Sequence, residues 1–123
     1  MRIVATGICH SDYSVVHGVL RSPLPVVLGH EAAGIVEETG PGVHDFAPGD
    51  RVIASLTPAC GLCPMCREEK PFLCHQTVAT MGFSTMVDGT TRLRAGGKAV
   101  HQLCAIGSFA ENAVIPVRSL AKV

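Results

Sequence analysis

Residues 60–74 read CGLCPMCREEKPFLC and carry four of the chain's six cysteines. The two-residue gaps let successive sulfurs fold back onto one zinc ion at about 2.3 Å, and Cys74 completes a tetrahedral set. Two disulfides or chance enrichment are the alternatives, but three cysteines within seven residues are too crowded for ordinary disulfide geometry. A closed four-sulfur site leaves no position for a substrate. We therefore expect a structural zinc bound by Cys60, Cys63, Cys66 and Cys74.

The segment around these cysteines is expected to form a separate zinc-binding lobe at about residues 57–76. Pro58, Pro64 and Pro71 discourage regular structure within it. The metal is then expected to take the place of a hydrophobic core.

Outside this lobe, short β-prone runs alternate with glycine and proline turns, a pattern typical of a barrel or sandwich. One helix is expected over Asp12–His17, capped by Ser11 or Asp12 and ended by Gly18, and it should be the longest. The predicted fold class is mainly β with short helices. Strands are expected at residues 2–8, at 26–28, from 32 onward, at 52–55 and at 109–117.

The composition suits a single folded domain of 123 residues, with 47% apolar and 16% charged residues. Ten basic and ten acidic residues cancel, so no nucleic-acid or anionic membrane partner is expected. No apolar run approaches the roughly 20 residues that span a bilayer, and no signal peptide is visible. We expect a cytoplasmic protein with reduced thiols.

A second set of metal ligands is formed by Cys9, His30 and Glu31. A catalytic zinc usually has three protein ligands and one open position, and the third ligand here is open between Glu31, Cys104 and a residue outside the chain. Cys104 stands in an apolar setting, where an unpaired cysteine is more often a small buried hydrophobe.

Three motifs in order resemble those of the zinc-containing alcohol dehydrogenases of the medium-chain dehydrogenase family. They are ATGICHSD at residues 5–12, GHEAAGIVEETGPGV at 29–43 and the four-cysteine loop. Residues 86–117 also resemble the branch that contains long-loop alcohol dehydrogenases and glutathione-dependent formaldehyde dehydrogenases. The resemblance covers nearly the whole chain.

This resemblance implies that residues 1–123 are a truncated GroES-like catalytic domain. The third catalytic zinc ligand, a cysteine, and the Rossmann domain of the family would lie beyond Val123, and no GxGxxG occurs here. The strands that precede residue 2 in the family are also absent. The full-length protein is expected to be a homo-oligomeric NAD(P)-dependent zinc alcohol dehydrogenase, and this chain alone is expected to be inactive.

The resemblance also implies a role for individual residues. Ser11 would take the alcohol proton, and Leu20 and Leu56 would face an aliphatic substrate pocket, although both leucines could equally be ordinary core. Ser14 replaces the histidine that ends the proton relay in many family members. The remaining roles are Cys9 and His30 as ligands of the catalytic zinc, Glu31 beside that zinc, Asp12 orienting the ligand histidine and His10 near the cofactor pyrophosphate.

The sequence therefore predicts hydride transfer between a small alcohol or aldehyde and NAD(P), with zinc at both sites. A glutathione- or thiol-dependent formaldehyde dehydrogenase is the alternative within the family. A zinc-binding module without redox activity, or a truncated gene product, is the alternative from another class.

Overall fold

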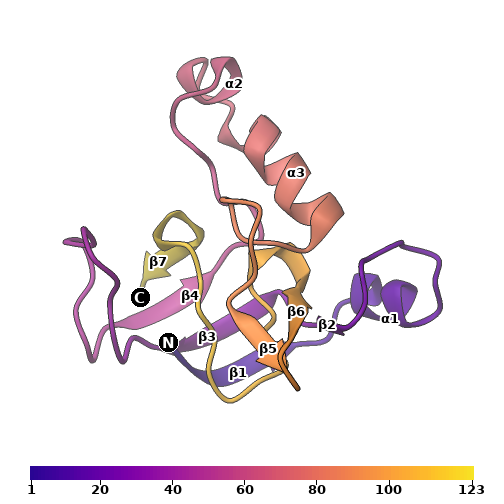
Figure 1. Cartoon of the computed structure of the whole chain (residues 1–123). Helices are drawn as coiled ribbons and strands as arrows, with labels where there is room; N and C mark the ends of the chain where they lie inside the picture. Colours follow the sequence, from indigo (N-terminus) through magenta and orange to yellow (C-terminus); the bar gives the residue numbers. More distant parts are fainter.

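A four-stranded antiparallel sheet lies at the centre of the computed structural model, which describes all residues, 1–123 (Figure 1). In a second, three-stranded sheet, β6 pairs with β2 in parallel and with β5 in antiparallel orientation. Together the two sheets confirm the predicted mainly β fold. The first sheet has the order β1 (Arg2–Gly7), β3 (Glu31–Ile35), β4 (Arg51–Ala54), β7 (Leu120–Lys122), and the second has the order β2 (Val26–Val27), β6 (Lys98–Gln102), β5 (Leu93–Ala95).

The core of the molecule is small and includes fully buried polar side chains, of which Gln102 is the largest. Ile106 and Val52 are its largest fully buried aliphatic residues. Gln102 is also fully buried, but its amide is satisfied: Nε2 donates to the Val114 carbonyl at 3.2 Å, and Oε1 accepts the Arg92 N–H at 3.1 Å. Because unpaired buried amides are costly, these bonds hold the end of β6 in one position.

The helices are short and fall into two groups. In Figure 1, α2 and α3 form a lobe that projects from the sheets, while α1 lies at another side of them. No helix is both long enough and apolar enough to cross a lipid bilayer. The α-helices are α1 (His10–Val16), α2 (Pro64–Arg67) and α3 (His75–Phe83), and the 3₁₀ turns are η1 (Pro71–Leu73), η2 (Leu103–Ala105) and η3 (Val117–Ser119).

The prediction that the zinc-binding lobe lacks regular structure is wrong. Pro64 and Pro71 each stand at the start of a helical turn, where the missing N–H has no intrahelical partner to lose. The longest helix is α3, not the one after Ser11. It buries Thr77 and Thr80, two poor helix formers, so its stability comes from tertiary packing that local propensity does not reveal.

The predicted first helix exists but begins earlier than expected. Cys9 is the N-cap residue of α1, so the prediction that Ser11 or Asp12 caps it is wrong. Asp12 lies instead at the third helical position, and its Oδ2 accepts the Cys9 N–H at 3.1 Å. The helix ends at Val16, shortly before Gly18, as predicted.

The predicted strand at residues 109–117 is also wrong. This segment crosses between elements and makes only an isolated bridge, from Asn112 to Arg2. Phe109 donates its N–H to the Leu28 carbonyl at 2.9 Å, so this N–H is hydrogen-bonded without belonging to a β-strand pair. The strand that returns to the central sheet is β7, which pairs with β4.

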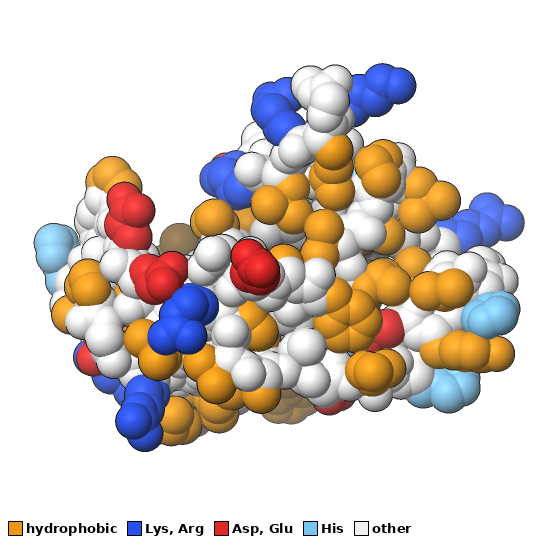
Figure 2. Space-filling view, turned by 90° about the horizontal axis from the view of Figure 1, so that it is seen from below, with side chains coloured by type: hydrophobic (Ala, Val, Ile, Leu, Met, Phe, Trp, Pro, Cys, Tyr) orange, Lys and Arg blue, Asp and Glu red, His pale blue; other side chains and the backbone are white.

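The molecule exposes many apolar side chains, which are spread over the face shown in Figure 2. Its accessible surface is 7425 Å². A folded monomer of 12.9 kDa is expected to expose about 6,300 Å². The excess indicates a structure that is less compact than a typical monomer of this mass.

Candidate metal centres

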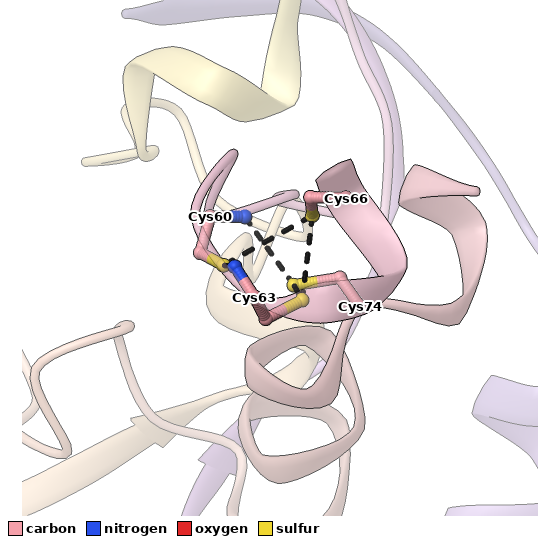
Figure 3. A group of neighbouring side chains, drawn as sticks. All are labelled: Cys60, Cys63, Cys66 and Cys74. Carbon is pink, nitrogen blue, oxygen red and sulfur yellow. Dashed lines mark hydrogen bonds between the residues drawn. The ribbon is translucent and has the colours of Figure 1, made fainter. Parts of the chain in front are cut away.

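The four cysteines of the zinc-binding lobe point toward one common centre (Figure 3). Their sulfurs all lie within 4.8 Å of one another, with 3.6 Å between Cys63 and Cys66, 3.9 Å between Cys63 and Cys74 and 4.0 Å between Cys60 and Cys66. A regular tetrahedron with Zn–S bonds of about 2.3 Å has edges of about 3.8 Å. A disulfide would need about 2.05 Å. The donor set therefore fits one zinc ion, and all six cysteines of the chain are free thiols.

Backbone N–H groups surround this four-cysteine cluster and favour the ionised form of two sulfurs. Burial opposes ionisation of Cys74, but N–H donors from Cys60 and the first turn of α3 outweigh it and lower its pKa to about 6. The Cys66 N–H contributes most to lowering the pKa of Cys63. Burial raises the pKa of Cys66 to about 11. Because zinc binds thiolates, metal binding would displace the proton from that thiol.

The lobe around the cluster is not held together by apolar packing. Leu62 is 70% exposed and Phe72 is 67% exposed, although both lie between or beside the cysteines. Within residues 57–76, Pro58 and Cys74 are buried. This arrangement supports the expectation that a metal replaces the core of the lobe.

The second group of ligand atoms comes from the ends of two neighbouring strands. Cys9 follows β1, and His30 and Glu31 stand at the start of β3. Antiparallel pairing of Gly7 with Glu31 places these ends side by side, so the three ligand atoms lie within 4.8 Å of one another. A thiol, an imidazole and a carboxylate form a donor set that suits zinc.

Asp12 connects the backbone around this second cluster. Its carboxylate is buried and accepts the N–H of Gly29 at 2.8 Å and that of Cys9 at 3.1 Å. The same carboxylate lies 3.5 Å from Nδ1 of His30, which is also buried and has no other partner. This placement favours a proton on Nδ1 and leaves Nε2 free to bind a metal. The position agrees with the orienting role that the sequence suggested for Asp12.

The carboxylate of Glu31 occupies space that exists because residue 7 is glycine. A Cβ at Gly7 would collide with Oε2 of Glu31 and lie 3.2 Å from its Cβ and Cδ. Gly7 lies within the motif at residues 5–12, but the motif gave it no role. The strand pairing of Gly7 with Glu31 is the structural signal that identifies it.

Gly7→Ala is therefore expected to displace the Glu31 side chain. Glu31 is exposed and can swing aside, so the free energy of unfolding should change by less than about 1 kcal/mol. Metal affinity at Cys9 and His30 should fall by about 10-fold or more, because the neighbouring carboxylate is lost. Cobalt titration would measure it. Gly40→Ala is the control, since a Cβ there meets nothing within 4 Å, and equal affinities in both variants would contradict the expectation.

The side chains assigned to proton and cofactor handling lie along α1. The Ser11 hydroxyl is 3.1 Å from the Cys9 sulfur, beside the ligand set. His10 is exposed, and its Nδ1 lies 3.3 Å from the Ser14 hydroxyl. α1 thus places the Ser11 hydroxyl beside the metal ligands and the His10 imidazole at the surface.

Other predicted residues are not brought to this second cluster. Leu20 is 49% exposed and Leu56 is half-buried, and neither lines the two main surface hollows. The larger hollow, about 600 Å³, contains none of the candidate ligands. Cys104 is buried outside the ligand set, and burial, more than the charges of Asp12 and Cys9, raises its pKa to about 11.

Three solved structures resemble this chain over 99% of its length. The alcohol dehydrogenase zinc-binding domain protein from Burkholderia ambifaria is 41% identical, with a TM-score of 0.91, over 99% of this chain and 33% of its own. Benzyl alcohol dehydrogenase from Acinetobacter calcoaceticus is 34% identical, with a TM-score of 0.86, over 99% and 32%. A zinc-binding dehydrogenase from Sinorhizobium meliloti, bound to NADP, is 34% identical, with a TM-score of 0.66, over 99% and 30%.

The chain thus spans about one third of the length of these relatives. The family described as the alcohol dehydrogenase GroES-like domain matches all of residues 1–123. Together with the two sheets and the four-cysteine cluster, this match confirms the resemblance that the sequence motifs indicated. The chain belongs to the GroES-like domain family of zinc-dependent alcohol dehydrogenases.

Proposed function

We propose that this chain provides the zinc-binding catalytic domain of an NAD(P)-dependent alcohol dehydrogenase. The observation that carries the proposal is the second cluster, in which Cys9, His30 and Glu31 place their ligand atoms within 4.8 Å of one another, apart from the closed four-cysteine cluster. An incomplete ligand set of this kind leaves room for a substrate oxygen. The NADP bound to the Sinorhizobium meliloti relative supports a nicotinamide cofactor.

In the proposed reaction an alcohol loses a hydride to NAD(P)⁺ and a proton to the protein, and an aldehyde or ketone is formed. Zinc would supply Lewis acidity that makes the alcohol hydroxyl easier to deprotonate. Ser11, whose hydroxyl lies 3.1 Å from the Cys9 sulfur, would take up that proton while passing its own hydroxyl proton on to water. Asp12 would keep His30 in one tautomer and one orientation. We further propose a small alcohol or aldehyde as substrate and a cytoplasmic homo-oligomer as the complete protein.

A zinc-binding module without redox activity is the second candidate. It is favoured by the four-cysteine cluster, whose closed ligand set suits a structural metal. Such a module needs the four-cysteine cluster but has no use for a second metal.

Cobalt titration of the metal-free chain distinguishes the two. We expect two classes of site, and the weaker one should change its absorption spectrum when a primary alcohol such as benzyl alcohol is added. His30→Ala should abolish the weaker class and the alcohol response, while His44→Ala, at an exposed histidine, should leave both intact. A single class of site, or an alcohol response that survives in His30→Ala, would refute the dehydrogenase proposal.

A further inference from the structure

Arg118 connects the far end of the chain to the first cysteine of the four-cysteine cluster. It lies in η3, immediately before β7. Its Nη1 donates to the carbonyl of Cys60 and, at 3.4 Å, to that of Ala59. Few other side chains in the molecule reach so far along the sequence, and nothing in the motifs assigned this arginine a role.

The backbone at Gly61 is shaped to receive the guanidinium. A Cβ at Gly61 would collide with Nη1 of Arg118 and lie 3.3 Å from its Cζ. The residue also has a φ of +75°, which favours glycine. Arg118 therefore lies directly against the peptide bonds on both sides of Cys60.

Those peptide bonds aim Cys60 at the other ligands. The Ala59 carbonyl and the Cys60 N–H belong to the same planar peptide and point in opposite directions. Arg118 holds the carbonyl side, and the N–H side points at the Cys74 sulfur, at 3.3 Å. The Cys60 sulfur in turn accepts the N–H of Cys63 at 3.3 Å. By holding the Ala59 carbonyl, Arg118 therefore also fixes the direction in which the Cys60 N–H points, toward the Cys74 sulfur.

The charge of Arg118 acts in the same direction. Four thiolates around one dication leave an excess of negative charge, and a guanidinium stays protonated at all physiological pH values. Another cation of the lobe, Lys70, is already paired with Glu68 at 3.1 Å. Arg67 is exposed on α2 and makes no hydrogen bond to the loop backbone through its side chain.

We propose that Arg118 is a positioning residue for the structural zinc. From η3 it holds Cys60, so that the four sulfurs are already arranged for the metal before the metal binds. The proposal rests on zinc binding by the four-cysteine cluster and not on dehydrogenase activity. Ser55 donates its N–H to the Ser119 carbonyl at 2.7 Å, so the same segment also holds the entrance to the lobe. The lobe and β7 are in this way coupled through one side chain and one backbone bond.

The test is the rate at which zinc passes from the chain to a colorimetric chelator, measured in a Cys9→Ser background so that only the four-cysteine cluster contributes. Arg118→Ala and the better-packed Arg118→Met should release zinc about 10- to 100-fold faster. Arg118→Lys, which keeps a cation and N–H donors on a long side chain, should recover most of the loss. Arg67→Ala removes one positive charge within the lobe without removing the contact, and it should match the unsubstituted background.

The absorption of the cobalt-substituted cluster provides a readout that stability alone does not change. Its thiolate charge-transfer bands should shift in Arg118→Ala and Arg118→Met and return in Arg118→Lys. Release rates within twofold of the background in both neutral variants would overturn the proposal. So would equal release from Arg67→Ala and Arg118→Ala, because charge alone would then explain the effect.

Discussion

Cys66→Ser is expected to remove the tightly bound zinc from the chain and to unfold the zinc-binding lobe. The variant leaves three sulfurs where four now surround one centre, with three of the sulfur–sulfur pairs 3.6–4.0 Å apart. Structural zinc sites contribute apparent binding free energies of about 10–16 kcal/mol, and this lobe has no apolar core to compensate. Elemental analysis should show one fewer zinc per chain, and limited proteolysis should cut within residues 57–76.

Cys104→Ala is the matched control for this experiment. It also removes one thiol, but Cys104 is buried outside both groups of ligand atoms. Its tight zinc should be retained and its lobe should stay resistant to protease. Full zinc content in Cys66→Ser, or equal zinc loss in the two variants, would show that the four-cysteine cluster is not the tight site.

Asp12→Ala is expected to lower the free energy of unfolding by about 2–5 kcal/mol. The substitution leaves the N–H groups of Gly29 and Cys9 without their acceptor, and each unpaired buried donor costs about 1–3 kcal/mol. It also removes the carboxylate that lies 3.5 Å from His30. Urea unfolding would measure the stability, and cobalt titration would measure a concurrent loss of affinity at Cys9 and His30.

Two further variants separate the contacts of Asp12 from its charge. Asp12→Asn keeps one acceptor oxygen and should cost less than Asp12→Ala. Asp45→Ala removes an exposed aspartate that makes no hydrogen bond through its side chain, and it should change stability by no more than about 0.5 kcal/mol. A loss in Asp12→Ala no greater than that in Asp45→Ala would contradict the role assigned to the buried carboxylate.

The metal site and the family were the features best predicted from the sequence, because both depend on residue type and spacing. The cysteine gaps of residues 60–74 indicated a tetrahedral site, and the structure brings those four sulfurs together. The motifs at residues 5–12 and 29–43 indicated the family, which the match over the whole chain confirms. The roles proposed for individual residues at the second cluster stay predictions until the metal titrations are done.

Secondary structure was predicted less well in the lobe and after it. Pro64 and Pro71 stand at the first position of α2 and η1, whereas these prolines were expected only to interrupt regular structure. Nothing in the local sequence of α3 indicated nine helical residues, because packing stabilises it. Leu20 and Leu56 line neither of the two main hollows, and their place in a substrate pocket stays a prediction.

The sequence by itself determined the ligand types, their order and the mainly β character, because these follow from side-chain chemistry, spacing and turn residues. Only the tertiary structure decided how distant peptides meet. The register of β1 on β3 sets Gly7 against Glu31, and the path of η3 sets Arg118 against Cys60. Such contacts depend on where the backbone passes after long loops close, and no local pattern in the sequence encodes that path.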